Sequence, residues 1–423
     1  METRVKYGRG ELEISIPNSC DVTIVESRSD AGYADPDAEI RRRLNDPIDS
    51  PPLTELLEAV DTVGVIFSDI TRATPNSTIL PPILDACETA GIKDSNVRLF
   101  NATGTHRTNT ESELRELLGS EIAGRYRVVQ NVATGSGFTQ VGTTRSGNDI
   151  LINEELLQCD LRILTGYIEP HFFAGFSGGG KAVMPGCAAL ETIRRNHSPL
   201  HIDHELASWG ILDGNPIAEE VVESIGMVGA CFLLNITLNR SREITGVFAG
   251  DVQVAHKMGS EFVKARAMQG VSDRFDIVVT SNAGYPLDGN LYQSVKGLSA
   301  ASRIVRDGGD IIVCAACDDG IPDHGSYARL LASTEGPGEL LHQIRNGEID
   351  DQDIWQVQIQ ARIAERAHTH LYTTGLTPDE VKRCHFEPTS SVSSLLKQLV
   401  QPSGDGTSVC VLPEGPETIP YLI

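Results

Sequence analysis

The stretch DTVGVIFSDITR, residues 61–72, sets the fold class of this chain. Its first part, residues 61–67, is an apolar run that predicts a strand of the buried type found in parallel sheets. Polar residues follow directly, and a helical pattern then runs from about residue 77 to 90 and stops at Gly91. A strand, a polar loop and a helix in this order predict a βα unit.

Two more units of the same kind follow along the chain. A strand predicted at 97–100 leads through a polar loop to a helix, whose start is marked by Thr110 and Glu113 at capping-box spacing. A third strand, at 161–164, leads into a long loop at 165–186. Strands that alternate with helices indicate an α/β fold with mostly parallel sheets.

Four side chains in these loops could bind or react with a ligand: Asp69, Arg72, His106 and His171. Each lies after a predicted strand and before the next helix. Loops at the carboxyl ends of parallel strands converge on the ligand crevice of such sheets. We therefore expect the four side chains to meet in space.

The third loop, GYIEPHFFAGFSGGGKAVMPG at residues 166–186, predicts an ordered anion-binding segment. A connection of this length inside a compact domain is usually functional when it is not disordered, and its paired phenylalanines argue against disorder. Gly178, Gly179 and Gly180 let backbone N–H groups approach an anion, and Lys181 follows them at once. The loop lacks the Ser or Thr of a nucleoside-triphosphate loop, and no GxGxxG opens a helix anywhere in the chain.

Histidines in and near this loop have two interpretations each. His106 and His171 could be surface residues, but their convergent loops favour catalysis. His197, expected at the end of a helix, could be a cation that stabilises the negative helix end or a ligand. His201 and His204 complete the run HSPLHIDH, which suggests a metal site, although Pro199 disrupts helical spacing. The remaining histidines, at 256, 324, 368, 370 and 385, are interpreted as structural.

Composition narrows the classes of function. Thirty-five Lys and Arg against 58 Asp and Glu give a net charge of −23, which disfavours nucleic acid and anionic membranes as partners. An anionic substrate would therefore need a locally basic pocket. The N-terminus does not resemble a signal peptide and no apolar run reaches membrane-helix length, so we expect a cytoplasmic protein. The nine cysteines are scattered, and the Cys314/Cys317 pair is interpreted as structural.

The length of 423 residues predicts two domains, because single cores stop growing at roughly 250–300 residues. We expect an N-terminal α/β domain at 1–271, to which the tail 403–423 returns, and a C-terminal α/β domain at 272–402. An active-site cleft is expected between them. An opening hairpin near residues 4–16 is expected to flank the main sheet.

Several of these motifs together resemble the nickel-dependent lactate racemases and their relatives. The carriers of the resemblance are, in chain order, SDITR at 68–72, GTHR at 104–107, the segment 169–181 that begins EPHF and ends in Lys181, the Asn-His pair at 196–197, YPL at 285–287, YQSVK at 292–296 and LPEGP at 412–416. Because unrelated motifs match in order over most of the chain, the resemblance is specific.

The resemblance implies a nickel-pincer nucleotide joined covalently to Lys181, with His197 as the remaining nickel ligand. It implies that the N-terminal domain binds this cofactor and that the C-terminal domain caps the substrate. It further implies that His106 and His171 act as the two acid/bases while the cofactor accepts hydride from a 2-hydroxy acid. The other implied cofactor-binding residues are Asp69, Thr71, Arg72, Gly178, Gly179 and Gly180. The implied substrate-binding residues are Arg72, Tyr292, Gln293, Lys296 and Trp355, of which Trp355 could equally be a core aromatic.

The favoured function is racemisation of a short aliphatic 2-hydroxy acid such as lactate. One alternative is a racemase or 2-epimerase of a larger acid, such as malate, an aryl-lactate or a sugar acid. Another is a non-catalytic protein that binds the nucleotide and nickel, which would not need both His106 and His171. Partners implied by the resemblance are the enzymes that build the cofactor, and the oligomeric state stays open.

Overall fold

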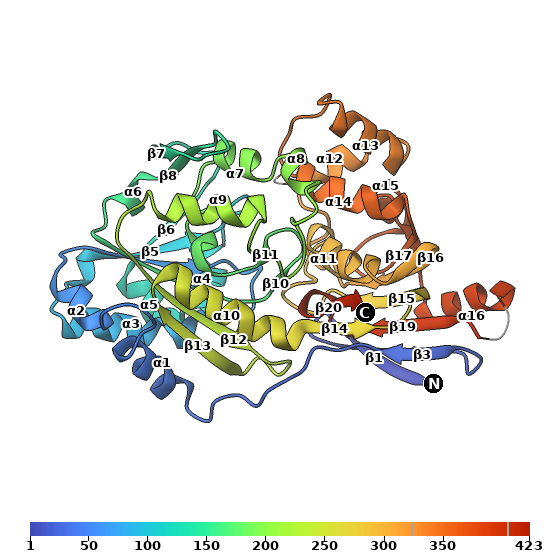
Figure 1. Ribbon diagram of the computed structural model, residues 1–423, viewed down its shortest axis with the longest axis horizontal. Coiled ribbons are helices and arrows are strands. Elements are labelled where there is room, and N and C mark those ends of the chain that lie inside the picture. The colour runs from blue at the N-terminus through green and yellow to red at the C-terminus, as the bar shows by residue number, and fades with distance from the viewer. Residues whose placement is uncertain (324, 404–405) are drawn as a thin grey trace.

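The computed structural model describes residues 1–323, 325–403 and 406–423 and consists of two α/β units, each built on a six-stranded sheet (Figure 1). The expected α/β architecture with mostly parallel strands is confirmed. Among the described residues, no helix is both long enough and apolar enough to cross a bilayer.

The first sheet has the order β13-β12-β9-β4-β5-β6, and only β13 runs antiparallel to its neighbour. Its strands are β4 (Val63–Ser68), β5 (Val97–Ala102), β6 (Arg127–Gln130), β9 (Leu161–Tyr167), β12 (Cys231–Leu238) and β13 (Ile244–Gly250). The strand β9 is buried at all seven positions, which explains its continuous apolar character.

Helices cover both faces of the first sheet. The helices packed through one apolar core on one face are α1 (Pro36–Asn45), α2 (Leu53–Glu58), α3 (Asn76–Thr89), α4 (Glu111–Leu118) and α5 (Ser120–Arg125). The expected capping box at the start of α4 is present, with Thr110 and Glu113 bonding reciprocally. The other face packs against α7 (Leu190–Asn196), α9 (Pro216–Ile225) and α10 (Val252–Ala267).

The second sheet is entirely parallel and has the order β18-β17-β16-β15-β19-β3. Its strands are β3 (Asp21–Ile24), β15 (Phe275–Ser281), β16 (Val305–Cys314), β17 (His368–Tyr372), β18 (Glu387–Thr389) and β19 (Ser408–Leu412). Its helices are α11 (Leu291–Ser302), α12 (Tyr327–Leu331), α13 (Pro337–Arg345), α14 (Ile354–Ala364), α15 (Pro378–Arg383) and α16 (Val392–Ser403).

The C-terminal tail was expected to return to the N-terminal domain, but its strand β19 (Ser408–Leu412) joins the second sheet. This strand pairs with β15 on one side and with the edge strand β3 on the other, so it lies inside the second sheet. The physical reason is burial: Val409, Cys410, Val411 and Leu412 are all fully buried, which a central position in a parallel sheet satisfies. The tail then ends in β20 (Ile419–Leu422), which pairs with β14 (Met268–Val271).

The opening hairpin also belongs to the second unit. Strands β1 (Glu2–Tyr7) and β2 (Gly10–Ser15) pair as expected, but their apolar side chains pack in one cluster with β15, β16, β19 and α16. The first residues of the chain therefore cover the C-terminal sheet, together with β3 at its edge.

Smaller elements complete the first unit. They are η1 (Asp94–Asn96), the hairpin of β7 (Phe138–Thr143) with β8 (Asp149–Asn153), α6 (Glu154–Leu157), the short β10 (Pro170–His171) and β11 (Gly175–Phe176), η2 (Gly179–Ala182), and α8 (Pro199–Ile202). In the second unit, η3 (Gly415–Glu417) links β19 to β20. The long loop predicted after β9 is thus ordered, as expected, and folds into β10, β11 and η2.

Candidate active site

A cavity of about 130 Å³ lies at the carboxyl ends of β4, β5 and β9, where α11 and α14 of the second unit approach. It receives most of the predicted site residues from both units. The predicted residues that line it are Asp69, Arg72, His106, His171, Gly178, Lys181, His197, Tyr292, Gln293, Lys296 and Trp355. Thr71, Gly179 and Gly180 lie just outside this lining. The expected convergence of Asp69, Arg72, His106 and His171 is therefore observed.

His106 follows β5 and is held by a carboxylate. Its Nδ1 lies 2.8 Å from Oδ2 of Asp69, and Thr71 donates from its hydroxyl to the other oxygen of Asp69, also at 2.8 Å. Burial alone raises the pKa of Asp69, but His106, Arg72 and Thr71 outweigh burial and hold this pKa below its ordinary value. An ionised Asp69 accepts the Nδ1 proton, so the neutral form of this imidazole has its lone pair on Nε2. The side-chain nitrogen of Gln293 lies 3.3 Å from this Nε2, in place to donate to it.

His171, on β10, has a different environment. It is buried between the rings of Phe172 and Phe173, at centroid distances of 5.0 and 4.5 Å. Burial lowers its pKa well below the ordinary value, and Lys181 and other nearby cations lower it further. Its Nδ1 accepts the backbone N–H of Ala174 at 3.3 Å. The neutral ring therefore carries its proton on Nε2, the opposite tautomer to that of His106.

Basic side chains gather around these histidines. Arg72 forms an ion pair of 2.9 Å with the buried Glu169. The Nζ of Lys296 is buried and has no hydrogen-bond partner among the described residues. Burial lowers the pKa of Lys296 to about 7, with Arg72 acting in the same direction. Burial also lowers the pKa of Lys181 well below its ordinary value, aided by Arg72 and Lys296, so that its amine is driven towards the neutral, nucleophilic form.

His197 ends α7 and packs edge-on against Phe173 and Trp355, at centroid distances of 4.9 and 5.2 Å. Burial, followed by the charge of Lys181, lowers its pKa well below the ordinary value. A lowered pKa disfavours the charged ring that a helix-end cation would need. Its Nδ1 bonds Oδ1 of Asn196 at 2.8 Å, which leaves Nε2 for a ligand or metal.

The histidine run HSPLHIDH does not form a chelating triad. The Nδ1 of His201 bonds the backbone oxygen of Asn196 at 2.9 Å, and His204 is exposed. Within the described part of the chain, no three His, Cys, Asp or Glu side chains are grouped to hold a metal ion. The Cys314/Cys317 pair is buried and unbridged, as the structural interpretation expects, and burial raises both thiol pKa values to about 12.

The glycines before Lys181 contact side chains that the sequence analysis did not identify. A Cβ at Gly178 would lie 2.5 Å from Oδ1 of Asn235, and one at Gly179 would lie 2.6 Å from the ring of His256. The N–H of Gly179 donates to Oδ1 of Asn235 at 2.7 Å. The Nε2 of His256 bonds the backbone oxygen of Ser177 at 2.9 Å, so this histidine is structural, as interpreted. Asn235 and His256 lie on β12 and α10, far along the chain from the loop.

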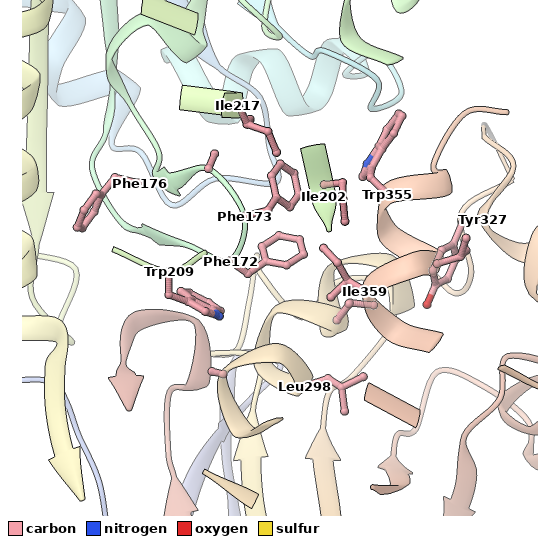
Figure 2. Close-up of a cluster of buried hydrophobic side chains, with 14 of the residues drawn as sticks. Phe172, Phe173, Phe176, Ile202, Trp209, Ile217, Leu298, Tyr327, Trp355 and Ile359 are labelled. Atoms are coloured by element: carbon pink, nitrogen blue, oxygen red, sulfur yellow. The ribbon is translucent and has the colours of Figure 1, made fainter. Parts of the chain in front are cut away.

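The second unit closes the cavity with two helices. Tyr292, Gln293 and Lys296 lie on the first turns of α11. The indole Nε1 of Trp355, on α14, donates to the hydroxyl of Tyr292 at 2.8 Å. Trp355 is 2% exposed and also lines the cavity, so it is both a core aromatic and a lining residue. In Figure 2, Trp355 lies beside Ile202 and Phe173.

The fold and the site define a class: a two-unit α/β protein whose cleft combines two imidazoles, a buried lysine of lowered pKa and cations for a small anion. Residues 7–210 match the family model described as the lactate racemase N-terminal domain, and residues 271–419 match that of the lactate racemase C-terminal domain. The chain belongs to the lactate racemase family.

Individual relatives agree with this assignment. A lactate racemase of Thermoanaerobacterium thermosaccharolyticum is 33% identical over 420 residues, 98% of each chain. One of Lactiplantibacillus plantarum is 36% identical over 381 residues, 89% of each chain. A solved structure of the lactate racemase apoprotein from T. thermosaccharolyticum superposes with a TM-score of 0.90 at 31% identity, covering 99% of this chain and 100% of that one. The resemblance stated from the motifs is thereby confirmed.

Proposed function

We propose that this protein interconverts the two enantiomers of lactate, with His106 and His171 as paired acid/bases. The observation that carries the proposal is the meeting of His106 and His171 with Arg72 and Lys296 in one cavity. His106 presents the lone pair of Nε2 to accept a hydroxyl proton, and Asp69 stabilises the imidazolium that forms. His171 would be the acid/base for the other enantiomer. The histidine that takes the hydroxyl proton releases it to solvent, and the other histidine takes up a proton from solvent before it protonates the product oxygen, so the protons balance over one turnover. The other enantiomer follows the same steps in reverse.

The carboxylate of the substrate is assigned to Arg72 and Lys296. A bound carboxylate favours the charged form of Lys296, whose pKa is held down by burial when the cavity lacks a counter-ion. Arg72 is fixed for this task by Glu169. With Lys181 neutral, Arg72 and Lys296 are the cations among the described lining residues, which is sufficient for one carboxylate. A short monocarboxylic acid therefore suits the site better than malate.

We further propose that the site holds the nickel-pincer nucleotide implied by the motifs. The residues fit this group: burial lowers the pKa of Lys181, which favours the neutral amine that covalent attachment requires, and Nε2 of His197 would be the nickel ligand because its Nδ1 is bonded to Asn196. Asp69, Thr71, Arg72 and the glycines at 178–180 would hold it from the first unit. When bound, the group would accept and return the hydride of the substrate C2–H bond. Partner enzymes that build the group are required by the same proposal.

Loading the cofactor has a steric consequence. The cavity of about 130 Å³ is smaller than the roughly 300–1,000 Å³ that encloses a drug-sized ligand. A movement of the second unit away from the first would make room for a mononucleotide. Reclosure would bring α11 and α14 back over the site and exclude water from the reacting centre.

The test is enantiomer interconversion by protein produced together with cofactor-building enzymes. Lactate labelled with deuterium at C2 should be racemised with the label retained, because hydride is not exchanged with water. His106→Ala and His171→Ala should each lower the rate by about 10²–10⁴-fold. The exposed His204→Ala is the matched control and should keep full activity. Loss of the label to solvent, or full activity in both variants, would contradict the proposal.

Intact-mass measurement tests the covalent attachment separately. The active protein should carry added mass that peptide mapping places on Lys181, and Lys181→Ala should lack it. Active protein with unmodified Lys181 would overturn the attachment while leaving the racemisation standing.

A further inference from the structure

A second cavity, of about 350 Å³, lies next to the active-site cavity, with which it shares Phe172, at the junction of the two units. We call it the junction cavity. From the first unit it is lined by Phe172 and by residues between 202 and 209, and from the second by the ends of α11, α13 and α14. Figure 2 shows Phe172, Trp209, Ile202 and Ile359 converging there. Its volume is within the range of small-molecule sites.

The lining of the junction cavity is basic in an otherwise acidic chain. Its four arginines, Arg303, Arg345, Arg362 and Arg366, face a single lining carboxylate, that of Glu365. Arg362 and Arg345 form ion pairs with the same carboxylate, Asp203, at 3.0 and 3.7 Å respectively. Arg366 pairs with Asp307 at 2.7 Å. Positive charge therefore remains in excess, whereas the whole chain carries a net charge of −23.

Arg303 is the arginine of this cavity that has no counter-ion among the described residues. Its Nε donates to the backbone oxygen of Pro420 at 2.8 Å, and its Nη1 donates to the hydroxyl of Ser208 at 3.1 Å. Within the described residues it forms no ion pair, and its Nη2 makes no hydrogen bond. Burial lowers the pKa of this guanidinium. A partly buried arginine without a carboxylate is costly unless an anion is bound beside it.

We propose that the junction cavity is an effector site for a small organic anion with two or more negative charges, of the phosphate or polycarboxylate type. Arg303 and Arg362 would grip its oxygens with planar guanidinium forks. Ser299 and Ser302 also line the cavity, and Trp209 and Phe172 supply an apolar wall for the carbon skeleton.

The position of the junction cavity links its occupancy to the active site. Ser208 belongs to the first unit and Arg303 to the second, so their bond exists only while the units are close. Arg362 likewise donates across the junction to the backbone oxygen of Ile202 at 3.1 Å. An anion that contacts both units favours the closed arrangement, and by linkage the closed arrangement favours the anion. Phe172 lines both cavities and is stacked on His171.

The binding test uses pyrophosphate and citrate as probes of the two anion sources, with titration calorimetry and thermal shift on the full chain. Either probe should bind the parent protein and raise its melting temperature. Arg303→Gln combined with Arg362→Gln should weaken binding at least ten-fold. Arg72→Gln, which removes a cation of the active site, should leave binding intact, and the exposed Arg115→Gln is the neutral control.

Each other outcome overturns the proposal. Absence of binding by both probes at millimolar concentration would show that the arginines serve the fold alone. Binding lost in Arg72→Gln but kept in the double variant would place the anion in the active site. Should Arg303→Gln fail to fold, Arg345→Gln with Arg362→Gln, both exposed on the rim, must show the same weakening.

Discussion

Replacement of Lys296 by methionine should stabilise the fold and abolish turnover at the same time. The chain keeps a buried ammonium at this position without a hydrogen-bond partner among the described residues. Its pKa falls from 10.5 to about 7, chiefly through burial. Each pKa unit is worth about 1.4 kcal/mol, so the charged form costs the folded state about 5 kcal/mol. Methionine has a similar length and removes the charge.

The direction of the pKa shift determines how the stability difference between the two proteins changes with pH. Because the folded pKa is depressed, folded and unfolded chains both carry the proton below pH 7, where the cost is fully present. Between pH 7 and 10.5 the unfolded chain binds more protons, so the cost shrinks as pH rises. The stability gap between Lys296→Met and the parent protein should therefore be largest at pH 6. It should narrow by about 3 kcal/mol on going to pH 9.5.

Urea unfolding of the apoprotein at pH 6 and 9.5 measures this gap, because other titrations cancel between the two proteins. The exposed Lys93→Met is the matched control and should show no gap at either pH. A gap that stays constant between the two pH values, or a variant less stable than the parent at both, would refute the reasoning.

Three further predictions concern the same site. The KM for lactate should rise above pH 7, by up to ten-fold per pH unit, because free Lys296 loses the proton that binds the carboxylate; steady-state kinetics at constant ionic strength would show this. Asp69→Asn should lower kcat about ten- to a hundred-fold by losing the charged bond that orients His106, while mass spectrometry still finds the cofactor attached. Gly179→Ala should destabilise the protein by at least about 1–3 kcal/mol in urea unfolding, because φ is +57° and a buried imidazole blocks the added Cβ. Gly147→Ala, also at positive φ but facing open space, should cost less.

Local patterns predicted the parts of the fold that depend on neighbouring residues. The strand β4, the capping box of α4 and the meeting of Asp69, His106 and His171 all follow from apolar runs, end signals and a general rule for parallel sheets. The place of the tail did not follow, because the apolar run at 409–412 would suit the interior of either sheet. The second sheet is distinguished by the pairing of β19 with β15 and with β3, the latter almost 390 residues earlier in the chain.

The sequence predicted which residues form the site, but it did not predict which ring nitrogens of its histidines carry protons. The tautomer of His106 is set by Asp69, whose loop was expected nearby, but that of His171 depends on one backbone N–H within a tight turn. The shape of the glycine loop depends on Asn235 and His256, which come from distant elements. Residues that act by filling space beneath a loop leave no mark in the sequence of the loop itself.

The contrast between two buried clusters indicates what the site is built for. Arg242 and Glu417, at the junction of the units, form a matched pair at 3.1 Å, as a purely structural contact requires. Around Lys181 and Lys296, the ion-pair partner of Glu169 among the described residues is Arg72, and burial together with Arg72 lowers the pKa of both amines. A carboxylate beside Lys296 would stabilise the fold, but it would compete with the substrate and restore the charge of Lys181. The unpaired cations are thus explained by a ligand that brings its own negative charge and by an amine that must remain neutral to be acylated.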